Sequence, residues 1–235
     1  MHTAIITGIN RIRINTDGDG VTTLVCFYGC PLNCKYCINP HTKNFFFRPP
    51  FALLGTYNPK KLFDEVKKDD LYFQATKGGI TLGGGEPLKN SDFIIDFMNL
   101  VFEHNKSVKL NPWEINFETC FNISFENIEK ILDKYPNMIG KIYVDIKCVD
   151  NDSYKKYTRV ELGNERVIEN IEKVVAKMGS DWIREHLFVK LPNIPEFYKV
   201  QEKDIDFVTS LGVPKTNIVL LDYVKNGQFK SLPLS

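Results

Sequence analysis

Six short apolar segments, each bounded by turn-forming residues, have the pattern of β-strands. They cover residues 21–27, 79–82, 113–120, 141–147, 187–191 and 217–223. Between them apolar residues recur at helical spacing, most clearly over 164–178, where Gly179 marks a C-terminal stop. Similar helical patterns follow Ser91 and Ser124. Strands that alternate with helices predict parallel βαβ units and hence an α/β fold, wound right-handed into a sheet or partial barrel.

Two of the predicted strands are apolar on one face and polar on the other. The polar faces over 113–120 and 141–147 carry Glu114, Asn116, Glu118 and Cys120, and Tyr143, Asp145 and Lys147, respectively. The lumen of an ordinary parallel barrel is apolar. Polar inner faces therefore predict an interior that holds a polar ligand, whereas an edge strand with its polar side in water explains either strand taken alone.

Composition narrows the class of protein. The chain has 235 residues, of which 43% are hydrophobic and 25% charged, and its net charge is +1. Such a chain is globular, and without a basic stripe we expect neither nucleic acid nor a membrane as partner. No apolar stretch approaches the roughly 20 residues that span a bilayer, and no secretory signal is recognisable. We expect a cytoplasmic protein with a single domain over residues 1–235.

Four of the six cysteines lie within a dozen residues near the N-terminus. Three of them form the sequence Cys30-Pro-Leu-Asn-Cys34-Lys-Tyr-Cys37, directly after a predicted strand. Three close thiolates select a soft-metal site, either zinc or an iron–sulfur cluster. A structural zinc site needs a fourth protein ligand, for which Cys26 or His41 would have to serve. A four-iron cluster with three ligands leaves one iron open for a substrate or cofactor, and we favour this hypothesis.

Around these cysteines the chain resembles the radical S-adenosylmethionine (SAM) superfamily, and within it the glycyl-radical-enzyme activases. The family's D-G-P-G…G-C-P-L opening resembles Asp17-Gly18-Asp19-Gly20-Val21 followed by Gly29-Cys30-Pro31-Leu32, and its Y-C-x-N-P continuation resembles Tyr36-Cys37-Ile38-Asn39-Pro40. The resemblance implies a partial (β/α)6 TIM-like barrel of the radical SAM type. It also implies that the three cysteines ligate a [4Fe–4S] cluster whose fourth iron binds SAM, and that Tyr36 and Asn39 belong to the cofactor-binding loop.

A glycine-rich turn extends the resemblance. Taken alone, Gly83-Gly84-Gly85-Glu86-Pro87 predicts only a tight connection after a strand. It resembles the superfamily's G-G-E-P element, which implies that Gly84, Gly85, Glu86 and Pro87 bind the SAM amino group. Glycines let backbone carbonyls approach an ammonium, and Glu86 adds the opposite charge.

Two further motifs lie on the strands with polar faces. Asp145-Ile146-Lys147 resembles the D-x-K of the activases, and Glu118-Thr119-Cys120 resembles their E/D-T-x element. The resemblance implies that Lys147 meets the SAM carboxylate beside Asp145, as the two catalytic residues, and that Glu118 and Asp145 share a monovalent cation. Taken by themselves, Asp145 and Lys147 would form a surface ion pair that contributes little to the stability of the fold. A further SAM contact is expected from Lys190, or from Arg184 after a small insertion.

The chain departs from the family's motifs at several places. Asp19 and Thr22 stand where the family has proline and arginine, and Val224 stands where it has a histidine. Lys190 cannot reproduce the bidentate clamp of the family's arginine. These departures bear on the protein substrate more than on the SAM chemistry. Elsewhere we expect structural roles for Cys26, Cys120 and Cys148, and packing of the phenylalanines at 45–47 and 51 over the cysteine loop.

The sequence thus predicts a radical SAM oxidoreductase that works anaerobically. It would cleave SAM reductively to a 5′-deoxyadenosyl radical and install a glycyl radical on a partner enzyme. The resemblance implies a glycyl radical enzyme as protein substrate and a flavodoxin or ferredoxin-type protein as electron donor. One alternative is a radical SAM enzyme that modifies a small molecule or a ribosomal peptide. Another, from a different class, is a non-catalytic metal or iron–sulfur binding module.

Overall fold

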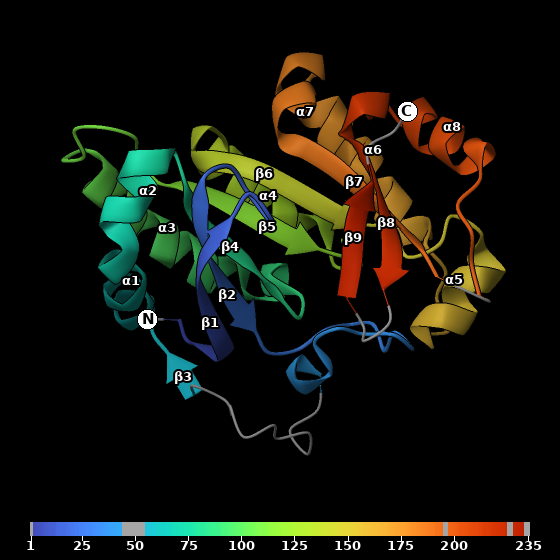
Figure 1. Ribbon diagram of the computed structural model, residues 1–235, viewed down its shortest axis with the longest axis horizontal. Coiled ribbons are helices and arrows are strands. Elements are labelled where there is room, and N and C mark those ends of the chain that lie inside the picture. Colours follow the sequence, from blue (N-terminus) through green and yellow to red (C-terminus); the bar gives the residue numbers. More distant parts are fainter. Residues whose placement is uncertain (1, 44–54, 195–196, 225–227, 233–235) are drawn as a thin grey trace. The chain divides into compact units, whose positions relative to one another are not determined.

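The computed structural model describes residues 2–43, 55–194, 197–224 and 228–232 (Figure 1). The chain divides into two compact units, each built from separate stretches of sequence. Unit 1 consists of Met1–Cys30, Asn39–Glu118 and Glu126–Lys141, and unit 2 of Pro31–Ile38, Thr119–Phe125 and Ile142–Ser235. The single domain over residues 1–235 stays a prediction.

The sheet of unit 1 has the strand order β3-β1-β2-β4-β5. Its strands are β1 (Ala4–Ile14), β2 (Val21–Phe27), β3 (Gly55–Tyr57), β4 (Gly79–Gly84) and β5 (Glu114–Thr119). Strands β2, β4 and β5 run parallel, as predicted, whereas β1 pairs antiparallel with β2 and β3. The sequence pattern misses β1 because its register shifts twice and Ile12 has a positive φ of 55°, which interrupts the two-residue alternation.

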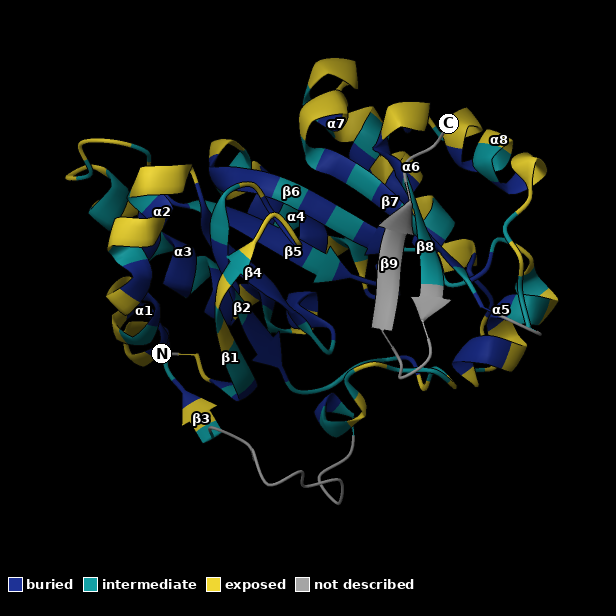
Figure 2. Ribbon diagram, in the orientation of Figure 1, coloured by how far each residue is buried: buried dark blue, intermediate teal, exposed yellow. Residues whose placement is uncertain are grey.

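The helices of unit 1 are α1 (Pro59–Val66), α2 (Asp70–Thr76), α3 (Ser91–Asn105) and α4 (Phe125–Lys134). Short 3₁₀ turns are η1 (Pro40–Thr42), η2 (Lys67–Asp69), η3 (Pro87–Asn90) and η4 (Pro136–Met138). The apolar faces of these helices are buried with the strands, as the dark blue of Figure 2 shows. Trp113 is 1% exposed and packs against Phe63 and Phe73 at ring distances of 5.7 and 5.3 Å. This core fixes one layer of helices on the parallel strands.

Unit 2 continues with β6 (Ile139–Asp145, which begins in unit 1), β7 (Leu187–Asn193), β8 (Ile218–Val224) and β9 (Gln228–Leu232). Strands β6, β7 and β8 are parallel, and β9 pairs antiparallel with β8. Its helices are α5 (Asn151–Thr158), α6 (Glu165–Met178), α7 (Ser180–His186), α8 (Glu202–Ser210) and the short η5 (Lys215–Asn217). Helix α6 begins one residue after the predicted start, because Asn164 is its N-cap.

The strands that carry the predicted site have the expected faces. Ile115, Phe117, Val144 and Ile146 are all buried, whereas the side chains of Glu118, Asp145 and Lys147 are half-buried. The α/β class and its parallel βαβ units are therefore confirmed. No helix in the described part of the chain is long and apolar enough to cross a membrane.

Candidate functional site: a cysteine loop, a glycine turn and an aspartate–lysine pair

The glycine turn at the end of β4 lies directly against the end of β2 within unit 1. The Gly85 N–H donates to the Phe27 carbonyl at 3.0 Å, and the Glu86 N–H donates to the Gly29 carbonyl at 2.7 Å. A Cβ on Gly85 would lie 2.3 Å from the Gly29 oxygen, and one on Gly84, whose φ is +86°, would lie 2.7 Å from the β2 backbone. Glycine is needed at both positions because the two backbones touch.

The same turn is joined to both ends of the cysteine loop. Gly29, which precedes Cys30, donates its N–H to the Thr42 carbonyl at 2.7 Å. On the far side of the loop, the side-chain amide of Asn39 donates to the Gly84 carbonyl at 3.4 Å, and the Thr42 hydroxyl donates to the Asn39 carbonyl at 2.7 Å. Unit 1 thus holds the start and the end of the loop on the glycine turn.

Glu86 is fully buried, and its carboxylate accepts the Leu88 N–H at 3.1 Å at the start of η3. Pro87 occupies the first position of that turn and is buried too. Glu86 therefore stabilises the turn as a cap, which is a role that the sequence does not predict for it. Its contact with the SAM amino group stays a prediction.

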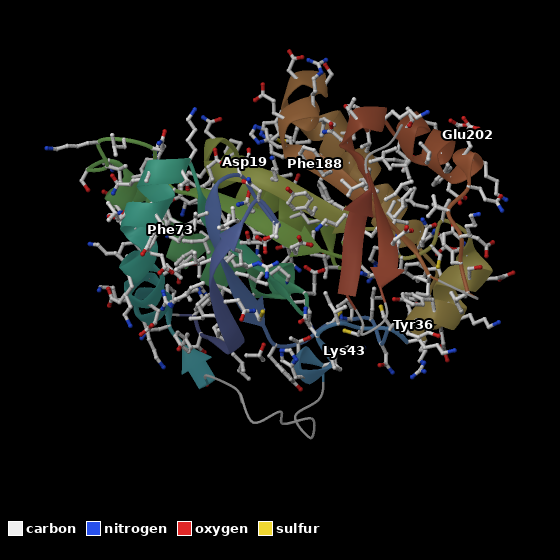
Figure 3. The ribbon with its side chains drawn as sticks, in the orientation of Figure 1. Asp19, Tyr36, Lys43, Phe73, Phe188 and Glu202 are labelled. Carbon is white, nitrogen blue, oxygen red and sulfur yellow. The ribbon has the colours of Figure 1, made fainter. Side chains whose placement is uncertain are left out.

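In unit 2 the middle of the cysteine loop is attached to the end of α5. The last carbonyls of a helix have no partner within the helix. Here the Asn33 N–H donates to the Thr158 carbonyl and the Lys35 N–H to the Tyr157 carbonyl, both at 2.9 Å. The ring of Tyr36, which is labelled in Figure 3, stacks on Tyr157 with centroids 6.3 Å apart. The helix end therefore orders the segment that carries Cys34 and Cys37.

Asp145 and Lys147 form an ion pair with a 2.7 Å separation, and their side chains are 24% and 21% exposed. Burial opposes the charge on Lys147, but its electrostatic interactions, of which that with Asp145 is the largest, outweigh it and raise the pKa of Lys147 well above its ordinary value. Lys147 therefore carries its positive charge beside the cysteine loop of the same unit. The predicted partnership of Asp145 with Lys147 is present in the structure, and their catalytic role stays a prediction.

The structure separates the two candidates for the additional basic contact. Lys190 on β7 is the register partner of Asp145 on β6, and its ammonium lies 4.2 Å from the centroid of the Tyr143 ring. Arg184 lies on α7, is 65% exposed and pairs with Asp181 at 3.2 Å. Residues paired across parallel strands point to the same face, so Lys190 shares the face of Asp145.

Glu118 lies at the end of β5, beside the glycine turn of unit 1. It is half-buried, and a Cβ on Gly83 would lie 2.9 Å from the Glu118 Cβ. The side chain of Glu118 therefore borders the turn that is joined to the cysteine loop. The monovalent cation that Glu118 and Asp145 would share stays a prediction.

Thr22 and Asp19, which depart from the family's opening motif, both form side-chain contacts in unit 1. The Thr22 hydroxyl donates to the buried carboxylate of Asp17 at 2.7 Å, and the Arg13 guanidinium binds the same carboxylate at 2.6 Å. Asp19 forms an ion pair with Lys141. Thr22 and Asp19 thus stabilise the β1–β2 connection. The side chain of Val224 and the phenylalanines at 45–47 and 51 lie outside the described residues.

The six thiols fall into two groups. Cys30, Cys34 and Cys37 are half-buried, whereas the other three are buried. Burial raises the pKa of the Cys26 thiol to about 11 and that of Cys148 to about 12, so these two are poor metal ligands and poor nucleophiles. Their burial is what a structural role, as expected from the sequence, requires.

No group of three or more His, Cys, Asp or Glu side chains within the described ranges is arranged to hold a metal ion. The ligand assignment to Cys30, Cys34 and Cys37 therefore stays a prediction. The donor set itself fits an iron–sulfur cluster, because three accessible thiols lie within eight residues on a loop whose ends and middle are held by backbone hydrogen bonds.

Comparison with known proteins agrees with this arrangement. Residues 24–196 match the family model of the Radical SAM superfamily. The chain is 30% identical to the pyruvate formate-lyase-activating enzyme of Clostridium pasteurianum over 220 residues, or 88% of this chain and 83% of that protein. It is 31% identical to the enzyme of the same name from Listeria monocytogenes, over 77% of this chain and 67% of that protein.

A more distant relative is the (2S)-3-sulfopropanediol dehydratase activating enzyme of Klebsiella oxytoca, 24% identical over 96% of this chain and 84% of that protein. The chain belongs to the radical SAM superfamily. The three relatives are all activating enzymes, so the family predicted from the sequence is confirmed.

Proposed function

We propose that this protein is a radical SAM activating enzyme that installs a glycyl radical on a partner enzyme. Its similarity to activating enzymes over most of their length supports the class of reaction. The observation that carries the proposal is the attachment of both ends of the cysteine loop to the glycine turn, through Gly29 and Asn39. This arrangement suits a cofactor that binds the cluster and the turn at once.

In this proposal Cys30, Cys34 and Cys37 hold the cluster, and the chain's polar groups hold SAM. A [4Fe–4S] cluster with SAM bound supplies one-electron cleavage of SAM to a 5′-deoxyadenosyl radical. The backbone at Gly84 and Gly85 can approach an ammonium because no side chain intervenes.

Lys147 offers a charged donor to the SAM carboxylate, and Asp145 orients it through their 2.7 Å contact. We assign the additional basic contact to Lys190, because it shares the face of Asp145, whereas Arg184 is exposed on α7. The ring of Tyr36, held by its stacking on Tyr157, would border the cofactor on the side of the cysteine loop.

The expected partners are a glycyl radical enzyme as substrate and a flavodoxin or ferredoxin-type protein as electron donor. The barrel curvature, the cation, the anaerobic cytoplasmic setting and the lack of nucleic-acid or membrane partners are proposals of the same kind. The alternatives make different predictions. A small-molecule or peptide substrate leaves the SAM chemistry intact, and a binding module leaves bound metal with no product.

The test is 5′-deoxyadenosine formation by anaerobically reconstituted protein given SAM and dithionite. We expect about four irons per chain and the cleavage product, followed by a glycyl radical signal in electron paramagnetic resonance when a glycyl radical enzyme is added. Bound iron without the product would overturn the enzymatic proposal. Product formation with no radical on any candidate partner would favour the small-molecule or peptide alternative.

A further inference from the structure

Three buried asparagines of unit 2 each bind two or more backbone carbonyls with a single side-chain amide. They are Asn164, Asn170 and Asn217, which are 2%, 2% and 3% exposed. A carboxamide has two N–H donors, so it can bridge carbonyls of a loop that has no strand or helix partner. Such a contact holds irregular backbone in one conformation, and losing it leaves buried carbonyls without a donor.

Asn164 holds the segment that follows Lys147. Its Nδ2 donates to the Cys148 carbonyl at 3.0 Å and to the Val149 carbonyl at 2.6 Å. The Val149 N–H donates to the Tyr198 hydroxyl at 3.2 Å, which fixes the same segment from another side. Asparagine at a helix N-cap usually caps the helix with its side chain, but Asn164 makes no such bond. Its side chain is directed to the loop instead.

Asn170, the sixth residue of α6, holds the segment that follows Glu118 and Thr119. Its Nδ2 donates to the Phe121 carbonyl at 2.8 Å and to the Ile123 carbonyl at 3.0 Å. Phe121 has a φ of +52°, a conformation that costs a non-glycine residue about 1 kcal/mol or more. The Phe121 N–H donates to the Thr119 hydroxyl at 3.0 Å, and the two carbonyl contacts of Asn170 attach this loop to α6.

Asn217 makes the same kind of contact elsewhere in the unit. Its Nδ2 donates to the carbonyls of Ile183, Arg184 and Leu187 at 3.1, 2.9 and 2.9 Å. These residues end α7 and begin β7, at the amino end of the strand, whereas Asn164 and Asn170 serve loops at the carboxyl ends of β6 and β5. Parallel α/β proteins place their sites at the carboxyl ends.

We propose that Asn164 and Asn170 are positioning residues within unit 2: Asn164 acts through Lys147, and Asn170 acts through the segment Thr119–Phe125 that follows β5. The inference rests on the proposed function and extends it to two residues that touch neither cluster nor SAM in that proposal. Helix α6 and its N-cap residue then support both of these loops. Asn217, which is 3% exposed and also binds backbone carbonyls through its amide, serves stability alone and is the matched control.

The first experiment uses cluster-free protein and measures backbone hydrogen exchange. Asn164→Ala should increase exchange at the Val149 amide, Asn170→Ala at the Phe121 amide, and Asn217→Ala at neither. Unchanged exchange at Val149 and Phe121 in their own variants would overturn the proposal, because the loops would then be held without the asparagines. Asn164→Asp, which removes both donors and keeps the shape of the side chain, provides the test at Val149 if Asn164→Ala does not fold.

The second experiment measures SAM cleavage by reconstituted protein at a temperature where every variant is folded. Asn164→Ala and Asn170→Ala should each lower kcat/KM for SAM by about 10- to 100-fold, which is about the effect of a misplaced contact group. Asn217→Ala should stay within about twofold. Asn164→Asp, which keeps the shape and removes both donors, should behave like Asn164→Ala.

Equal kinetic effects of all three alanine variants would show a general loss of stability and overturn the positioning role. Failure of the wild-type protein to form 5′-deoxyadenosine would instead contradict the proposed function. The exchange pattern of the cluster-free protein would still decide whether the two asparagines hold their loops, so the two failures are distinguishable.

Discussion

The glycine turn of unit 1 and the Lys147 loop of unit 2 are held in place by different kinds of contact. Backbone meets backbone at the glycine turn, where Gly85 and Glu86 donate directly to β2 and to Gly29. The Lys147 loop is held by side chains that come from far along the sequence, namely Asn164 and Tyr198. A backbone contact depends on the absence of a side chain, whereas a side-chain contact depends on one particular amide or hydroxyl.

This difference predicts two patterns of sensitivity. Any side chain added to the glycine turn should disturb the fold itself, because close-packed backbone cannot yield without cost. Changes in the Lys147 loop should affect chemistry first and stability second, since its ion pair is partly exposed. The predictions below test this contrast, from the largest expected effect to the smallest.

Removal of a predicted cluster ligand should abolish activity and leave the structure of both loops intact. Cys34→Ala should bind little iron and form no 5′-deoxyadenosine, while circular dichroism and the urea midpoint stay near wild type, because neither loop is built on the cluster. Cys26→Ala, a buried thiol outside the loop, is the control and should keep its iron. A Cys34→Ala variant that still cleaves SAM would refute the ligand assignment.

A methyl group in the glycine turn should cost stability. The Cβ of Gly85→Ala would lie 2.3 Å from the Gly29 oxygen, so we expect a loss of about 2–3 kcal/mol in the free energy of unfolding and severe loss of activity. Gly8→Ala is the control, because its Cβ would meet no atom closer than 3.8 Å. Urea denaturation measures both variants, and equal midpoints would show that the turn can relax.

Loss of the charge at Lys147 should reduce activity more than stability. Lys147→Gln is expected to lower kcat/KM for SAM by about 100-fold, or about 2.7 kcal/mol, with little change in the thermal midpoint. Lys141 is a matched control, since it lies on β6, the strand that precedes the Lys147 loop, is also 21% exposed and also pairs with an aspartate. If Lys141→Gln and Lys147→Gln lose the same activity, the loop has no special role.

Asp70 tests whether side-chain contacts in unit 1 act on stability alone. Burial opposes its charge, but hydrogen bonds from Gln74, His104 and Trp113 outweigh it and lower the pKa of Asp70. A carboxyl with a lowered pKa stabilises the fold above its unfolded pKa, and this contribution is lost as the pH falls below about 4.

Asp70→Asn should therefore cost about 1 kcal/mol at pH 7 and flatten the loss of stability in acid, with SAM cleavage unchanged. Asp92→Asn, whose ion pair with Lys130 is exposed, should change little. Urea denaturation at pH 7 and pH 3 measures the difference. If the free energy of unfolding of Asp70→Asn falls as steeply between pH 7 and pH 3 as that of the wild type, other carboxyl groups cause the loss of stability in acid.

Much of the fold follows from local patterns. Strand β2 has its predicted bounds, and β4, β5, β6, β7 and β8 agree within two residues at each end, because parallel strands carry strong apolar runs. The patterns miss β1, whose bulges break the alternation, and α5, whose sequence Asn-Asp-Ser-Tyr-Lys-Lys-Tyr-Thr is mostly polar. Contacts with the rest of the fold, and not a local sequence pattern, determine the secondary structure of both elements.

The sequence by itself determined the chemistry that this protein carries. Three thiols in eight residues, a triple glycine after a strand and an aspartate–lysine pair are local features, because ligand type and the exclusion of side chains depend on residue identity alone. For the same reason, the resemblance of these motifs to those of the family can be recognised in the sequence alone.

Only the tertiary structure decided how these groups are held. It attached the cysteine loop to the end of α5, turned Glu86 into a cap, placed Lys190 beside Asp145 and directed Asn164 and Asn170 to the site loops. Each of these contacts joins residues through a hydrogen bond or a strand register whose partner is chosen by the fold. An asparagine or a lysine looks the same in sequence wherever its partner lies, so its role becomes visible only when the chain is folded.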